Sequence, residues 1–266
     1  MRVVDAHVHL WDRTRHPLSW FRDDMGLAPR VTAADLEAEA AVDAAIAVQA
    51  ADTLDEAAWL AAQAAQSRML SRIVLQYSAA PGEWAGRSAA VLSSSVAGLR
   101  AAIPQCAADL SDVAGLDALA DGLIRTDRVL EFLIRPEQLA GVAAFADRHP
   151  ELRIVLCHLG LGNSTPTAPW RSDLIEIALR GNVHTKLSGV LTARTDRERR
   201  EISDAAVEAF GPDRMMFGSD WPMSARHLSH GEVVAATARM LTGLGPDEAA
   251  AVWHGTADRV YALGAS

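Results

Sequence analysis

Two histidines near the start of the chain could do chemistry together. His7 and His9 are separated by one residue at the end of the first short apolar run. Because side chains alternate between the two faces of a strand, these two imidazoles face the same side. They could bind one divalent metal or donate hydrogen bonds to one substrate oxygen. The alternation predicts two sets of side chains on opposite faces, namely Asp5, His7 and His9 on one and Val4, Ala6 and Val8 on the other.

A third histidine and an aspartate follow later apolar runs in the same way. His158 comes directly after residues 153–157, and Asp220 comes two residues after 214–218. Each also has an ordinary structural interpretation: a buried, hydrogen-bonded imidazole for His158, and a turn cap before Pro222 for Asp220. Together, three histidines and a carboxylate at the ends of apolar runs are much harder to explain in that way. The sequence therefore favours one polar site.

Short apolar runs alternate with longer helical patterns along the whole chain, which is typical of repeated βα units around a parallel sheet. We count eight such pairs. They predict a single (β/α)8 TIM barrel of the α/β class over residues 1–266, with an extra C-terminal helix at 247–262. Such barrels carry their chemistry at the carboxyl ends of the strands, where the long connections 7–31 and 158–168 also lie. The predicted strands are residues 2–6, 45–49, 71–77, 95–100, 128–133, 153–157, 182–187 and 214–218.

The charge balance favours a small-molecule substrate. The 266 residues include 25 Lys and Arg against 34 Asp and Glu, a formal net charge of −9, so neither nucleic acid nor an anionic membrane is expected as a partner. Cys106 and Cys157 share no CxxC spacing, which argues against a disulfide framework or a thiolate zinc site. No signal peptide or apolar run of about 18 residues is visible, so we expect a cytoplasmic protein, either a monomer or a homodimer.

Seven short motifs carry a family resemblance. They are Asp5-Ala6-His7-Val8-His9-Leu10-Trp11-Asp12, Val48-Gln49-Ala50, Gly98-Leu99-Arg100, Leu133-Ile134-Arg135-Pro136, His158-Leu159-Gly160, Lys186-Leu187-Ser188-Gly189 and Met216-Phe217-Gly218-Ser219-Asp220-Trp221-Pro222. Together they resemble the amidohydrolase superfamily, and more closely its amidohydrolase-2 branch, which contains sugar-lactone hydrolases of the L-fuconolactonase and L-rhamnonolactonase type. The resemblance covers residues 4–263. It implies a (β/α)8 barrel whose site lies at the C-terminal ends of the strands.

The resemblance also implies which residues form the site. Members of the branch differ in metal use, so metal-independent catalysis stays open beside a site for one divalent ion, with Zn²⁺ as the expected ion. A binuclear site is not expected, because Leu133-Ile134-Arg135 stands where binuclear relatives carry a histidine. The predicted strand 95–100 also ends in Leu99-Arg100, without a bridging Lys or Glu. The implied catalytic residues and metal ligands are His7, His9, His158 and Asp220.

The resemblance further implies hydrolysis of a small lactone, such as a sugar acid lactone or a related cyclic ester. Asp220, ionised and next to a water, would act as general base, and the water would attack the lactone carbonyl. Arg100, the histidines or a bound ion would stabilise the developing oxyanion. No covalent nucleophile is indicated, because the sequence has no GxSxG motif.

Several other side chains are candidates for contact with the substrate. For Lys186, an ion pair inside the barrel is an equal alternative. Gln49 and Arg135 could instead fix loops, and the tryptophans could be ordinary core packing. In the loop after Asp220, His227 and His230 could reach the pocket, but exposed positions are expected for both. The candidate substrate-binding residues are Arg100, Lys186, Gln49, Trp11, Arg135 and Trp221.

Two other functions remain open. A metal-dependent decarboxylase or hydratase of a small unsaturated or aromatic carboxylic acid would use the same barrel, and it would need a tightly held ion. A non-catalytic barrel that binds a carboxylate would turn over no lactone. That last interpretation leaves the convergence of three histidines and Asp220 unexplained.

Overall fold

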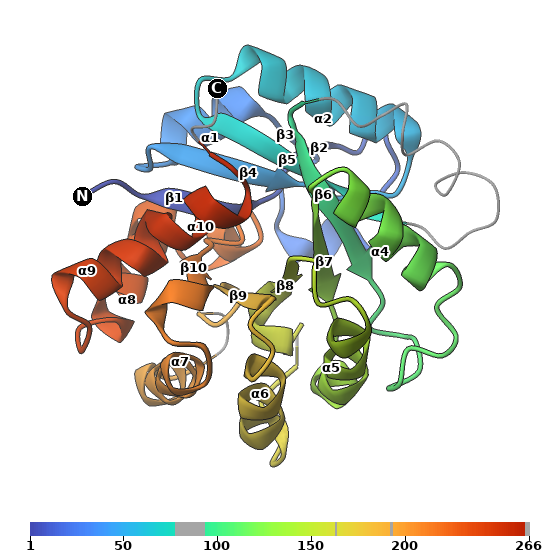
Figure 1. Cartoon of the computed structure of the whole chain (residues 1–266). Coiled ribbons are helices and arrows are strands. Elements are labelled where there is room, and N and C mark those ends of the chain that lie inside the picture. Colours follow the sequence, from blue (N-terminus) through green and yellow to red (C-terminus); the bar gives the residue numbers. More distant parts are fainter. Residues whose placement is uncertain (78–93, 163, 192–193, 264–266) are drawn as a thin grey trace.

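The computed structural model describes residues 1–77, 94–162, 164–191 and 194–263. In this part of the chain, eight parallel strands form one sheet in which each strand pairs with the next along the chain. Figure 1 shows them at the centre of the molecule, with helices around them. The predicted α/β class and strands are confirmed, with shifted boundaries. The strands are β1 (Val4–Val8), β4 (Ala44–Val48), β5 (Leu70–Tyr77), β6 (Val96–Ala102), β7 (Val129–Leu133), β8 (Ile154–Leu156), β9 (Val183–Leu187) and β10 (Met215–Phe217).

The ring of strands closes between β1 and β10. Val8 and Trp221 form a parallel bridge there. The amide of His9 donates to the Trp221 carbonyl at 2.7 Å, and the amide of Asp220 donates to the His7 carbonyl at 2.9 Å. This short seam makes the sheet a nearly closed TIM barrel. It also means that the backbone at the proposed site joins the first strand to the last.

Helices cover the outside of the strands and often begin at side-chain caps. Thr32 Oγ1 accepts the amide of Asp35 at 3.4 Å, and the Asp35 carboxylate accepts the amide of Thr32 at 2.8 Å, which is a capping box. The helix predicted after the third strand falls in residues 78–93, outside the described residues. Within the described ranges, no helix has the length and apolar character needed to cross a membrane. The helices after the strands are α1 (Ala33–Glu39), α2 (Leu54–Gln66), α4 (Leu116–Arg125), α5 (Leu139–Arg148), α6 (Trp170–Ala178), α7 (Asp196–Phe210) and α8 (His230–Met240), and the short 3₁₀ turns are Asp23–Met25, Pro136–Gln138, Cys157–Gly160, Pro212–Arg214 and Ser224–Arg226.

The predicted C-terminal helix is present as three consecutive segments. These are α9 (Pro246–Ala250), a π-helical turn (Ala251–Gly255) and α10 (Thr256–Val260). Val260 and Tyr261 belong to the same apolar cluster as Val4 and Ala6 of β1. The C-terminal segment therefore fills the barrel at the amino-terminal ends of the strands, which leaves the opposite end for the site.

The long connection after β1 contains a small hairpin. Its strands are β2 (Trp11–Asp12) and β3 (Arg30–Val31), which pair antiparallel. Trp11 is fully buried, donates from Nε1 to the Ala28 carbonyl at 2.9 Å and packs edge-on against Trp20. Trp11, predicted as a candidate for substrate binding, thus holds this connection together as a core residue.

Candidate active site

The strand that carries the two histidines contains a β-bulge. Asp5 and Val8, three residues apart, pair with β4 residues that are only two apart. As a result, Ala6 packs in the cluster inside the barrel, and His7 also faces the interior, where it contacts Lys186. Asp5 instead contacts helix α8 on the outside. The strict alternation predicted for β1 is therefore wrong at residues 5 to 7, although His7 and His9 do share one side.

His7 and His9 meet at the carboxyl end of β1. Their Nε2 atoms are 3.1 Å apart. His9 Nδ1 donates to the Val48 carbonyl at 2.7 Å, so the neutral ring keeps its lone pair on Nε2. Gly218 makes room for His7, because a Cβ at that position would lie 2.8 Å from His7 Cβ. Backbone and packing thus fix both rings.

His158 approaches the same place from the end of β8. It lies in a tight turn with a left-handed backbone, φ 53°, a conformation that costs energy in a residue with a side chain and is common at functional sites. Its Nδ1 is 2.8 Å from Ser188 Oγ, and a Cβ at Gly189 would lie 2.8 Å from that nitrogen. The His158 ring centroid is 4.7 Å from that of His7. The segment after β9 therefore positions this third histidine.

Asp220 completes the group from the end of β10. Its φ is also left-handed, at 58°. One carboxylate oxygen lies 3.6 Å from His9 Nε2 and 3.8 Å from His7 Nε2. The Asp220 side chain retains 19% exposure, so solvent reaches it, whereas His7 is fully buried. The structure thus brings together all four residues predicted as the polar centre.

Three of these side chains fit a metal ion. The candidate ligand atoms of His7, His158 and Asp220 all lie within 4.8 Å of one another. Burial, followed by the charges of nearby cations, holds the pKa values of the three site histidines below the usual range, at about 3 for His158. Neutral imidazole is the form that binds metals. Two imidazoles and a carboxylate, with His9 beside them, are a donor set that suits Zn²⁺.

The environment of Asp220 prepares it for proton transfer. Burial raises the pKa of its carboxyl to about 7, Arg100 opposes this change, and the carboxylate of Asp5 adds to it. A carboxyl that titrates near neutrality can accept a proton and return it. Asp220 is therefore chemically suited to general base catalysis.

Arg100 supplies a cation at this end of the barrel. Its Nε donates to Gln76 Oε1 at 3.1 Å, and its Nη2 donates to the Gln49 carbonyl at 2.9 Å. Gln49 is itself fully buried. Its side-chain Nε2 donates to the Thr53 carbonyl at 2.9 Å, and its Oε1 accepts the backbone amide of Gln76 at 2.7 Å. Gln49 thus fixes the loop after β4 and steadies Arg100, as in the loop-fixing alternative.

A second polar cluster lies deeper in the barrel, beneath the histidines. Lys186 Nζ is 2.7 Å from both carboxylate oxygens of Glu131 and 3.3 Å from His7 Nδ1. Tyr261 donates its hydroxyl to Glu131 at 2.6 Å, and Cys157 donates its thiol at 3.3 Å. The structure thus shows Lys186 in an internal ion pair. The sequence signal for Glu131 was a single acid inside an apolar strand, which needs a cationic partner once buried.

Two other candidates for substrate binding take structural positions. Arg135 donates to the Pro104 carbonyl and lies 3.3 Å from the Glu137 carboxylate, so it holds the loop after β7. Trp221 is 3% exposed and its carbonyl accepts the His9 amide. Its indole nitrogen has no hydrogen-bond partner among the described residues.

One histidine near the site is buried, although the sequence predicted an exposed position for it. His230, expected on an exposed loop, is fully buried. Its Nε2 donates to Asp5 Oδ2 at 2.9 Å. The two residues are 225 positions apart, so no local pattern could have paired them.

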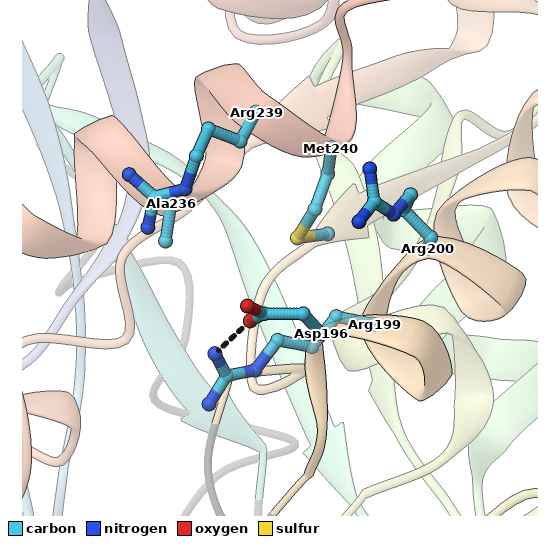
Figure 2. A pocket seen from close by; sticks show the side chains of 6 residues that line it. All are labelled: Asp196, Arg199, Arg200, Ala236, Arg239 and Met240. Atoms are coloured by element: carbon cyan, nitrogen blue, oxygen red, sulfur yellow. Dashed lines mark hydrogen bonds and ion pairs between the residues drawn. The ribbon is translucent and has the colours of Figure 1, made fainter.

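A groove on the outside of the barrel has a different character. It lies between α7 and α8, has a volume of about 60 Å³ and contains no histidine among its lining residues. Figure 2 shows its arginines around one acid, with Arg199 paired to Asp196. Arg199 also donates to the Leu191 carbonyl at 2.6 Å. No histidine lines this groove, so the barrel end, where three histidines meet Asp220, is the better candidate for acid–base chemistry. The lining residues are Asp196, Arg199, Arg200, Ala236, Arg239 and Met240.

Comparisons with known proteins agree with this fold. The profile of the family described as amidohydrolase matches residues 4–263, and the chain belongs to the amidohydrolase-2 family. The protein is therefore an amidohydrolase-related enzyme.

Curated relatives and solved structures indicate which amidohydrolases the chain resembles. The chain is 33% identical to an L-fucono-1,5-lactonase of Burkholderia multivorans, over 98% of this chain and 96% of that protein. It is 30% identical to an L-fucono-1,5-lactonase of Burkholderia ambifaria, over 98% and 95%. A crystal structure of an amidohydrolase from Burkholderia multivorans with bound zinc superposes with a TM-score of 0.89 at 32% identity and covers 99% of this chain and 100% of that one. Two curated homologues are thus lactonases, and one homologous structure holds zinc.

Proposed function

We propose that this enzyme hydrolyses a sugar acid 1,5-lactone. The observation that carries the proposal is the meeting of Asp220 with His7, His9 and His158 at one barrel end. The full-length similarity to two L-fucono-1,5-lactonases supports a lactone as the substrate class. A lactone needs only an activated water and a group that stabilises an oxyanion, and the site supplies both kinds of group.

Asp220 acts as the general base in this proposal. Its carboxylate accepts a proton from a water molecule as the water attacks the lactone carbonyl, and the protonated carboxyl then delivers the proton to the leaving alkoxide. A pKa of about 7 suits both steps, because the two protonation states are then close in free energy at neutral pH. The remaining 19% exposure of the side chain gives water and substrate access to it.

The neighbouring groups stabilise the negative charge that develops on the carbonyl oxygen. Arg100, held by Gln76 and the Gln49 carbonyl, contributes a fixed positive charge that needs no rearrangement during the reaction. After ring opening, the same cation favours the carboxylate product. His7, His158 and Asp220 would hold a Zn²⁺ ion, with His9 beside them, and a bound ion would polarise the carbonyl as a Lewis acid.

The test is a pH-indicator assay over a panel of sugar acid lactones, including L-fucono-1,5-lactone, with and without added Zn²⁺. We expect turnover of at least one lactone by the wild-type enzyme and loss of it in Asp220→Asn. Asp213→Asn, at an exposed position, is the matched control and should keep full activity. Absence of turnover across the panel, with release of CO₂ from aromatic acids instead, would replace the lactonase proposal with the decarboxylase alternative.

A further inference from the structure

We propose that His230 and Asp5 are positioning residues of the active site. This inference rests on the proposed function for its catalytic consequence, and on the geometry alone for its structural one. The pair lies between the bulged strand β1 and helix α8. The pair fixes the backbone at His7 and directly before Asp220, and neither residue is proposed to contact the substrate.

The carboxylate of Asp5 accepts three hydrogen bonds from three different parts of the chain. The amide of His7 donates to its Oδ1 at 3.1 Å, and the amide of Ser219 donates to the same atom at 2.9 Å. His230 Nε2 donates to Oδ2 at 2.9 Å. Both side chains of the pair are fully buried. One carboxylate therefore joins β1, the segment after β10 and the start of α8.

These bonds replace pairing that the sheet does not supply. The bulge in β1 shifts the ladder to β4 between Asp5 and Val8, and the Asp5 side chain takes the amide of His7 in that interval. On the other side, β1 and β10 meet through the short seam at Val8 and Trp221. Ser219 lies directly before Asp220, whose left-handed backbone needs support from its surroundings. Asp5 supplies support on both sides of the seam.

His230 is placed to hold the other oxygen of Asp5. It is the first residue of α8, and Ser229 caps that helix by accepting the amide of Glu232 at 3.3 Å. The amide of His230 donates to Glu39 of α1 at 3.2 Å. Its Nδ1 has no hydrogen-bond partner among the described residues, so the polar contact of the ring is the one to Asp5. Helix α8 thus presents a single donor to a buried carboxylate.

The experiment compares two substitutions at position 230. His230→Leu removes the donor, whereas His230→Gln places an amide N–H close to where Nε2 stood. We expect His230→Leu to lower both the affinity of the chelator-treated protein for Zn²⁺ and kcat by roughly 10- to 100-fold, as for lost partners of metal ligands. KM should change little, and His230→Gln should restore most of both losses.

His149→Leu is the matched control. His149 Nε2 lies 2.7 Å from Asp117 Oδ1 at the end of α5, away from the site. The His149→Leu substitution should lower the melting temperature without changing zinc affinity or kcat. The same pattern in folded His230→Leu would overturn the proposal and leave a purely structural pair.

Two further measurements keep the test decisive. If His230→Leu does not fold, Asp5→Asn replaces it, because the shape is kept while one acceptor becomes a donor. If no lactone is turned over, zinc titration and a crystal structure of the variant still decide. Residues 219–221 in their wild-type position in that crystal structure would contradict the positioning role independently of the proposed function.

Discussion

Two layers of polar side chains lie inside the same barrel, and they differ in how completely their groups are paired. In the lower layer, Lys186 and Glu131 satisfy one another, and Tyr261 and Cys157 donate to the same carboxylate. In the upper layer, the nearest histidine nitrogen to the Asp220 carboxylate is 3.6 Å away, and the side chain is partly exposed. Burial alone therefore does not mark function here. The layer with unfilled bonding capacity is the one suited to chemistry.

The lower layer also shows why a second metal does not fit. His7, Glu131 and Cys157 bring candidate ligand atoms close together, but the ammonium of Lys186 already lies against both oxygens of Glu131. Burial further raises the pKa of the Cys157 thiol, away from the thiolate that a metal requires. The ammonium group of Lys186 thus occupies the position that a second metal ion would need.

The largest effect on activity is expected for a substitution in the upper layer. Asp220→Asn keeps the shape of the side chain but removes the base, so kcat should fall by about 10²- to 10⁴-fold. The melting temperature should change little, because Asp220 takes no part in the ion pair of the lower layer. Steady-state kinetics on the best lactone and a thermal melt check both statements. Near-wild-type kcat would remove Asp220 from the mechanism.

The lower layer should respond in the opposite way. Lys186→Met leaves the buried Glu131 carboxylate without its cation, and losing one partner of such a pair costs about 3–5 kcal/mol of unfolding free energy. Urea unfolding measures this loss. Adding Glu131→Gln to the same chain should recover part of it, because the uncompensated charge is then gone. A stability change below about 1 kcal/mol, typical of exposed pairs, would contradict the pairing.

Zinc binding distinguishes the layers directly. Chelator-treated protein should bind at most one Zn²⁺ per chain, and His158→Gln should weaken binding by more than the roughly 10- to 100-fold expected for the loss of an outer partner. His184→Gln is the control, since His184 lies on β9 outside the ligand group. Calorimetric titration measures both affinities. Unchanged binding in His158→Gln would exclude this histidine as a ligand.

The smallest effect concerns pH. Because Asp220 must be ionised to act as a base and its pKa is raised to about 7, the activity of chelator-treated enzyme should be lost as pH falls through 7, by about tenfold per unit below it. Added Zn²⁺ should move the midpoint to lower pH, since a cation favours the carboxylate. Initial rates from pH 5 to 9 test this prediction. A flat profile in that range would contradict it.

The amino-acid sequence by itself determined the eight strands and the four residues at their ends. Short apolar runs are read locally, and the carboxyl ends of barrel strands converge in any such fold. For this reason His7, His158 and Asp220 could be placed together from distant parts of the chain. The same logic could not separate the two interpretations of Lys186, because its partner Glu131 is 55 residues away.

Only the tertiary structure decided the contacts around that centre. The bulge in β1 depends on the register between β1 and β4, and it leaves the Asp5 side chain facing α8 while the His7 ring faces the barrel interior. The partner that Asp5 then finds, His230, stands 225 residues along the chain. Local alternation determines which face a side chain takes only while the ladder is regular. Register and long-range packing, which the sequence does not display, decided which of the buried polar groups were left free to react.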